Sequence, residues 1–137
     1  MTEEIKKTTK SKVPSKKKVV KSIAEATLTV KSSFNNTIVT VSDMKGNTLT
    51  WSSAGHAGFK GARKSTPYAA TTAIEKALEA ARPYGIKKLA VYLKGPGVGR
   101  DAALRFLRAK REYDVDIIAD VTPIPHNGPR PSKARRV

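Results

Sequence analysis

The sequence predicts an α/β protein: a mixed five-stranded sheet in the chain order βββαβαβ, packed by two helices and carrying extended basic tails at both ends. Apolar and polar residues alternate with a period of two in the first half of the chain, which is typical of half-buried strands. Two later stretches repeat apolar residues every three or four positions, which indicates amphipathic helices. We therefore divide the chain into a disordered Lys-rich arm at 1–22, a globular domain at 23–122 and an extended basic tail at 123–137.

The first three strands are expected to form an antiparallel meander. Strand residues begin near Glu25, where Leu28 and Val30 alternate with threonines. Turn-forming residues then separate the apolar runs, so consecutive strands pair as hairpins. The second and third strands are expected at 37–42 and 48–53, after turns at 32–36 and 43–47.

Two helix–strand units follow the meander. Ser65 or Thr66 serves as the N-cap of the first helix, Pro67 lies near its first turn, and the Pro-Tyr-Gly sequence at 83–85 stops it. The apolar run LAVYL in the next strand predicts burial on both faces, as in the centre of an α/β sheet. The expected elements are a helix at 67–82, a strand at 88–94, a helix at 101–112 and a strand at 115–121.

Charge points to a polyanionic partner. The 137 residues include 27 Lys and Arg against 11 Asp and Glu, for a net charge of +16. Such self-repulsion is easiest to tolerate beside nucleic acid, with an anionic membrane surface as the weaker alternative. No apolar run approaches the roughly 20 residues of a membrane span, and no apolar signal segment opens the chain. With no cysteine and two histidines, we expect an intracellular protein without disulfide, metal site, cofactor or small-molecule substrate.

The connection at 55–70 is the leading candidate for a phosphate-binding loop. Its glycines recur every third residue and let the backbone approach a partner closely. The start of the following helix offers free N–H groups to an anion. The candidate ligands in this loop are His56, Lys60, Arg63 and Lys64. The alternative is a tight turn with solvated cations.

A second glycine-rich connection, Gly-Pro-Gly-Val-Gly-Arg at 95–100, lies before the second helix. It lacks the Lys and Ser/Thr of a Walker A loop, so a nucleotide site is not indicated. An ordinary turn and a backbone contact to phosphate both remain open, with Gly95, Gly97 and Arg100 as candidates. Connections at the carboxyl ends of strands meet at one edge of an α/β sheet, so both loops are expected there. Asn35 and Asn36 add uncharged donors for sugar or base edges.

Two other function classes stand as alternatives. The element order is similar to the ribonuclease H-like architecture, whose nucleases need clustered carboxylates for metal ions. Here Asp43, Glu75, Glu79 and Asp120 lie on different elements, so a metal-dependent nuclease is the weaker hypothesis and no enzyme is expected. The third hypothesis for the function is a general DNA-compacting protein. Trp51 and Phe59 are interpreted as packing residues rather than as base-stacking platforms.

Several long motifs in the same order closely resemble the universal S-eleven family of small-subunit ribosomal proteins, in its bacterial or organellar form. They are SSFNNTIVTVSDMKGNTLTWSSAGHAGFKGARKSTPYAA, KGPGVGR and ADVTPIPHNGPRPSKARRV, within a match from about residue 23 to 137. The resemblance implies a ribonuclease H-like fold without nuclease carboxylates and a structural role in the ribosome, with bacterial cytoplasm favoured over an organelle. It implies rRNA of the central domain as partner, on the platform near the mRNA exit and E site. The S-seven and S-eighteen families would be neighbours, beside the Shine–Dalgarno duplex of the mRNA.

The resemblance also implies which segments face rRNA. They are the turn at 33–36, the loops at 55–64 and 94–100, and the tail at 126–137, whose candidates are His126, Asn127, Gly128, Arg130, Lys133, Arg135 and Arg136. Two departures matter: Pro129 stands where the family usually has cysteine, and Pro-Ser-Lys-Ala at 131–134 replaces Pro-Pro-Lys-Lys. One tail cation is therefore lost. Val98 stands where the family often has a further proline, which loosens that turn.

Overall fold

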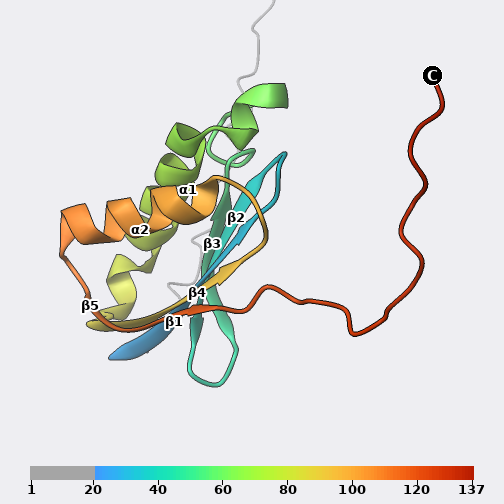
Figure 1. Ribbon diagram of the computed structural model, residues 1–137. Helices are drawn as coiled ribbons and strands as arrows, with labels where there is room; N and C mark the ends of the chain where they lie inside the picture. Colours follow the sequence, from blue (N-terminus) through green and yellow to red (C-terminus); the bar gives the residue numbers. More distant parts are fainter. Residues whose placement is uncertain (1–20) are drawn as a thin grey trace, which may run out of the picture.

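A computed structural model describes residues 21–137, so all of the predicted N-terminal arm except its last two residues lies outside the described part. The predicted order βββαβαβ is confirmed (Figure 1). The elements are β1 (Glu25–Ser32), β2 (Thr37–Asp43), β3 (Thr48–Ser53), a 3₁₀ turn η1 (Gly61–Ser65), α1 (Pro67–Ala81), a 3₁₀ turn η2 (Arg82–Tyr84), β4 (Lys88–Lys94), α2 (Gly99–Lys110) and β5 (Asp114–Asp120).

Local chemistry explains where the helices differ from their predicted bounds. Helix α1 gives way to η2 at Arg82, because Pro83 cannot continue the α-helical hydrogen bonds, and Gly85 then exits with φ +68°. Helix α2 begins at Gly99, two residues before the prediction, and ends at Lys110. Arg111 stops it by adopting the left-handed conformation (φ +47°) while its N–H donates to the Leu107 carbonyl.

The sheet has the strand order β3-β2-β1-β4-β5. The first three strands pair antiparallel as predicted, whereas β4 lies parallel to both β1 and β5. Strands β1, β3, β4 and β5 therefore all end at the same edge of the sheet, which we call the carboxyl edge. Every loop that the sequence singled out begins there.

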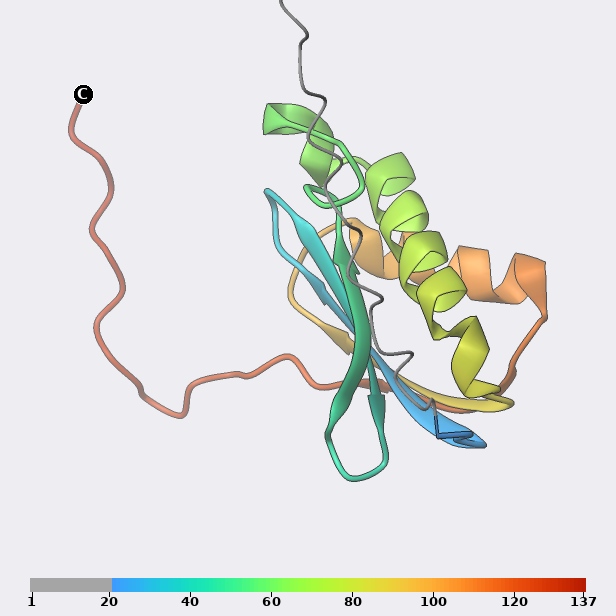
Figure 2. The ribbon, with the colours of Figure 1, turned by 180° about the vertical axis from the view of Figure 1, so that it is seen from behind.

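Both helices lie on one face of the sheet (Figure 2). Helix α1 packs on β2 and β3, and α2 packs on α1 and β1. The expectation that β4 is covered on both faces is corrected by this arrangement. Ala90 is buried and Tyr92 half-buried on the other face, yet no helix of the described part covers them. We call this second side the open face.

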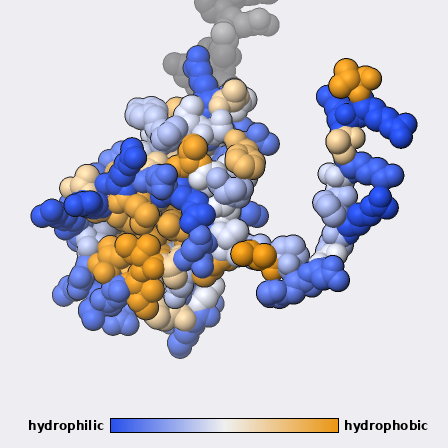
Figure 3. All heavy atoms as spheres, in the orientation of Figure 1, coloured by the Kyte–Doolittle hydropathy of each residue, from blue (hydrophilic) through white to orange (hydrophobic). Residues whose placement is uncertain are grey.

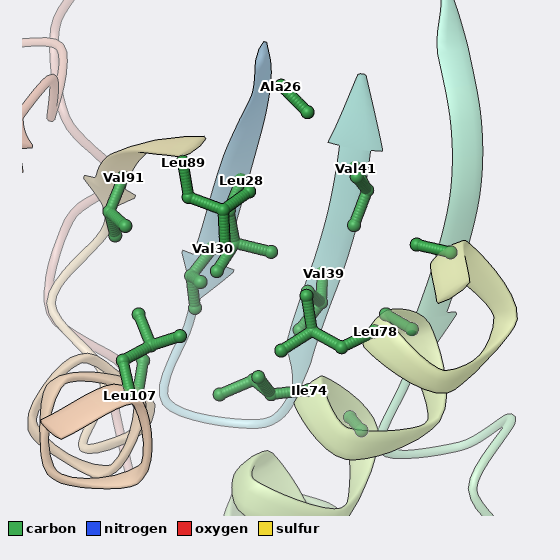
Figure 4. Close-up of a cluster of buried hydrophobic side chains, with 14 of the residues drawn as sticks. Ala26, Leu28, Val30, Val39, Val41, Ile74, Leu78, Leu89, Val91 and Leu107 are labelled. Atoms are coloured by element: carbon green, nitrogen blue, oxygen red, sulfur yellow. The ribbon is translucent and has the colours of Figure 1, made fainter. Parts of the chain in front are cut away.

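The core fills the space between the sheet and the two helices (Figure 4). Alternate residues of β1, β2 and β4 point into it, which is the burial that the period-two pattern predicts. Helix α1 contributes a buried face dominated by alanine, so its backbone can approach the sheet closely. The largest buried side chains include Leu28, Val30, Val39, Val41, Ile74, Leu89 and Val91.

Ser32, at the end of β1, fixes the glycine-rich connection between β4 and α2. Its carbonyl accepts the Gly97 N–H at 3.0 Å, and its hydroxyl accepts the Gly99 N–H at 3.1 Å. A Cβ at Gly95 would lie 2.1 Å from the Ser32 carbonyl oxygen, and one at Gly97 or Gly99 would lie 2.3–2.4 Å from its nearest neighbour. Gly95 and Gly97 lie against the backbone of Ser32 and Ser33, whereas Gly99 lies against the side chains of Ser32, Thr37 and Ala70. At all three positions the space is too small for a side chain.

This close approach predicts a large cost for Gly95→Ala. Gly46→Ala is the matched control, because Gly46 has a similar φ (+91° against +98°) but nothing within 4 Å of the place that an alanine methyl group would take. We expect the control to lose about 1 kcal/mol of unfolding free energy from backbone strain, and Gly95→Ala to lose about 2 kcal/mol more from the clash. Urea denaturation of the two variants measures both values; equal losses would contradict the packing role of Gly95.

Candidate nucleic-acid interface

Backbone hydrogen bonds tie the candidate segments together at the carboxyl edge. The loop after β3 is joined to the start of β2 by the Ala54 N–H, which donates to the Thr37 carbonyl at 3.0 Å. The loop after β4 is joined to the tail by the Gly95 N–H, which donates to Thr122 Oγ1 at 3.1 Å. Together with the contacts of Ser32, these bonds place the turn, both loops and the root of the tail at the carboxyl edge, where the sequence analysis expected the two loops.

The turn between β1 and β2 is built around Ser33. Its hydroxyl accepts the N–H of Asn36 at 3.1 Å and that of Asn35 at 3.4 Å. Asn36 uses its side-chain carbonyl to accept the Thr37 N–H at 2.9 Å, while Asn35 is exposed. Phe34, at the tip, is 75% exposed. Phe34 was not among the predicted site residues. The sequence feature that could have identified it is an aromatic residue flanked by polar turn-forming residues.

The loop after β3 presents its cations from an element that the sequence did not predict, η1. Arg63 and Lys64 lie in its last turn, and the Lys76 ammonium of α1 donates to the Ala57 carbonyl at 3.1 Å to hold the loop. Gly58 and Gly61 take positive φ with open space around them, so here glycine is required by backbone conformation alone. His56 and Lys60 are exposed on the same loop.

The start of α1 offers less to an anion than the sequence suggested. Thr66 is the N-cap, and its hydroxyl accepts the Ala69 N–H at 3.3 Å. Pro67 has no N–H, and the Ala70 N–H donates to the Thr66 carbonyl at 3.2 Å. Most of the first-turn donors are therefore used within the protein. An anion at this place depends mainly on the side chains of Lys60, Arg63 and Lys64.

The same holds for the loop after β4, where the glycine N–H groups already have protein acceptors. Contact of Gly95 and Gly97 with rRNA stays a prediction. In this conformation their N–H groups are not free to bind phosphate, because both donate to acceptors within the chain. Arg100 is also engaged: its guanidinium donates to the Gly95 carbonyl at 3.2 Å and forms an ion pair with Asp120.

Asp120 joins this loop to the tail. Its carboxylate accepts the Thr122 hydroxyl at 2.5 Å and the Thr122 N–H at 2.9 Å, besides the Arg100 guanidinium. These hydrogen bonds, those from Thr122 first, hold the pKa of Asp120 below its ordinary value. The carboxylate therefore stays ionised within the ordinary aspartate range. The stabilisation that the network provides is complete above that range and is lost as pH falls through the lowered pKa. We call this set, Gly95, Arg100, Asp120 and Thr122, the tail latch.

Two aromatic pairs lie at or near the carboxyl edge. The Trp51 ring lies 5.0 Å from that of His56, and Phe59 meets Tyr68 edge-on at 5.7 Å. Trp51 is 56% exposed on the open face, so its interpretation as a packing residue is corrected. Tyr68 is 72% exposed and was not predicted as a site residue. Exposed aromatic rings beside cations can stack on unpaired bases.

The tail from 123 to 137 leaves the carboxyl edge as an extended, fully exposed chain (Figure 1). Asn127 takes a left-handed φ of +56°, which forms a turn in its path. The tail carries His126, Asn127 and Gly128 at that turn, followed by Arg130, Lys133, Arg135 and Arg136.

The carboxylates do not assemble a metal centre. Within residues 21–137 no group of three or more His, Cys, Asp or Glu side chains could hold a metal ion. Asp43 and Asp120 end strands that point in opposite directions, so they lie at opposite edges of the sheet. Across the same residues, no helix is long and apolar enough to cross a membrane.

Comparison with known proteins gives one consistent result. The family model for ribosomal protein S11 matches residues 26–136. The small ribosomal subunit protein uS11 of Borreliella burgdorferi (strain ZS7) is 55% identical over 123 residues, covering 90% of this chain and 94% of the relative. The uS11 proteins of Teredinibacter turnerae and Shewanella amazonensis are each 54% identical, over 127 and 130 residues, and each alignment covers 93% of this chain and at least 97% of the relative. The chain therefore belongs to the ribosomal protein S11 family, whose members are structural, non-enzymatic proteins of the small ribosomal subunit.

Proposed function

We propose that the protein binds central-domain rRNA on the platform of the small subunit, near the mRNA exit and the E site, through its carboxyl edge and tail. The observation that carries this proposal is the convergence of the turn at 33–36, the two glycine-rich loops and the root of the tail at one edge. Segments that are far apart in the sequence thereby form one surface, and a rigid sheet keeps them in register.

The distribution of charge supports the same side. Close to the carboxyl edge, cations outnumber acids: Lys31, Lys60, Arg63, Lys64, Lys94 and Arg100 against Asp101 and Asp120. The tail adds four more cations and no acid. The opposite edge is mixed, and its acids are partly paired, as in the contacts between Arg82 and Glu112 at 3.5 Å and between Lys88 and Glu25 at 3.8 Å. Phosphates are therefore attracted to the carboxyl edge.

The side chains at this edge suit single-stranded or hairpin RNA. Phe34 and Tyr68 offer exposed rings for stacking, and Asn35 and His56 offer hydrogen-bonding groups. Among the described elements there is no recognition helix placed for a DNA major groove: α2 is buried on the sheet by Ala102, Ala103 and Leu107. The side chains favour rRNA as the partner. Membership of the S11 family adds, as part of this proposal, the neighbouring proteins of the S-seven and S-eighteen families and the nearby Shine–Dalgarno region of the mRNA, in the cytoplasmic ribosome.

Co-sedimentation of tagged protein through a sucrose gradient, at moderate and then at high salt, tests this proposal. An integral subunit protein stays with small subunits at both salts, because its many phosphate contacts are closed in by folded RNA. Loss at modest salt, or equal binding to duplex DNA, would instead indicate a general polycation.

The loop cations predict a specific binding defect. Arg63→Ala with Lys64→Ala should weaken binding to a central-domain rRNA transcript and lower the salt slope by about 1.4–1.8, from about 0.7–0.9 per cation. Neither residue has a described ion pair to lose, so thermal stability should not change. Lys45→Ala with Lys87→Ala removes the same charge at the opposite edge and should leave the slope nearly unaltered. Equal slopes for both double variants would contradict the assignment of the loop.

The tail latch predicts that removing the charge of Asp120 lowers the affinity for rRNA, whereas the change in net charge alone would raise it. Asp120→Asn makes the protein more positive than its net +16 and, by simple attraction, would tighten rRNA binding. Loss of the ion pair to Arg100 instead frees the root of the tail, so we expect affinity to fall by about fivefold. Glu79→Gln makes the same charge change at an exposed position of α1, and this variant should bind rRNA as the wild type does. Fluorescence anisotropy with the same transcript measures both; tighter binding by Asp120→Asn would refute the role of the latch.

A further inference from the structure

Strand β5 has an edge with exposed aliphatic side chains that no strand of residues 21–137 pairs with. It pairs with β4 on one side and is the last strand of the described sheet on the other. Ile117 is 51% exposed and Ile118 is 58% exposed. Such an edge presents free backbone N–H and C=O groups and is a template for an added strand.

An apolar groove runs beside this edge, between α2 and β5. Its volume is about 410 Å³, and it is lined by the apolar side chains of Leu104, Leu107, Tyr113, Val115 and Ile118 together with Arg108 and Arg111. Figure 3 shows hydrophobic side chains gathered over α2 and β5 with hydrophilic ones around them. RNA offers little to such a groove, because its surface is mainly phosphate and sugar. Aliphatic side chains from a protein would fill it.

The charge along β5 also disfavours RNA. Residues 112–120 contain Glu112, Asp114, Asp116 and Asp120 and no cation, in a chain with a net charge of +16. Glu112, Asp116 and Asp120 have ion-pair partners within the protein, whereas Asp114 has none among the described residues. On the open face, phosphates approaching this edge would meet the carboxylates of Asp114 and Asp116, which would attract lysine or arginine side chains. The two arginines of the groove, Arg108 and Arg111, lie on the helix side.

The register of β5 separates its two faces. Asp114 lies opposite Lys88, and Ile117 opposite Ala90, on the open face of the sheet. Asp116 lies toward the same face, because its carboxylate is 3.9 Å from the Lys88 ammonium. Val115 and Ile118 lie beside the core residues Leu89 and Val91, toward the groove. A strand added to this edge would place alternate side chains on these two faces.

We infer that the free edge of β5 receives an extended segment of a neighbouring protein of the subunit, which pairs as a sixth strand. Its aliphatic side chains enter the groove beside α2, and its lysines or arginines face Asp114 and Asp116. This inference rests on the proposed function, since it assumes the crowded setting of the small subunit. A second copy of the chain is a poor occupant, because self-pairing would bring the aspartates of two β5 strands together.

A photo-crosslinker on each side of the molecule tests the inference. Benzoylphenylalanine replaces exposed Ile117 in one protein and exposed Phe34, at the carboxyl edge, in another, and each is reconstituted into small subunits from purified components. We expect Phe34→benzoylphenylalanine to give rRNA adducts and Ile117→benzoylphenylalanine to give protein adducts. Mass spectrometry should map the latter to an extended segment in which basic and aliphatic residues alternate.

Charge reversal gives the matched control. Asp114→Lys, combined with the crosslinker at 117, should lower the protein adduct by about fivefold, because an attractive cross-strand pair becomes repulsive. Glu79→Lys makes the same charge change on α1 and should not affect it. An rRNA adduct at 117, no adduct there, or an adduct to a helical or acidic segment would overturn the inference while the rRNA adduct at 34 leaves the proposed function standing. Failure of both proteins to enter subunits would count against the proposed function itself.

Discussion

The architecture depends on how closely β1 and the loop after β4 approach each other at Ser32. The carbonyl and hydroxyl of this one buried residue accept two N–H groups of the loop, and the Ser32 hydroxyl lies 3.3 Å from that of Thr37 on β2. The contact joins the central strand, its antiparallel neighbour and the start of α2. Because it forms at the carboxyl edge, it also sets the distance between the turn at 33–36 and the tail latch. A small displacement here would move every segment proposed to face RNA.

This constraint changes the meaning of the glycine spacing. In the sequence, Gly95, Gly97 and Gly99 look like a loop that cradles phosphate. In the structure, backbone and side-chain atoms of the chain itself occupy the space that their missing side chains leave. Gly58 and Gly61 of the loop after β3 have open surroundings and positive φ, so the two loops use the same residue type for different physical reasons. Spacing alone cannot separate these cases, because the difference lies in what stands opposite the loop.

Periodicity predicted the strands of the meander and both α-helices, because burial on one side of an element leaves a repeating pattern in the residues that form it. Strand β4 was predicted from a continuous apolar run instead. Other features left no such pattern. A 3₁₀ turn as short as η1 has no period to detect, and the exposure of Trp51 follows from the absence of a helix on the open face of the described sheet. The ion pair of Arg100 with Asp120 joins residues 20 positions apart and depends on the parallel pairing of β4 with β5. The candidate cations were visible as residue types, but their common surface required the topology.

The extended tail has a consequence for the scale on which the protein acts. Fifteen residues span at most about 50 Å, from about 3.3 Å each, whereas a compact domain of about 100 residues has a radius of gyration near 13 Å. On the proposed function, the tail therefore reaches RNA strands that the folded body does not touch. RNA that folds around the tail would have to open before the protein is released. Retention in the subunit would then depend on RNA folding as well as on the strength of each tail contact.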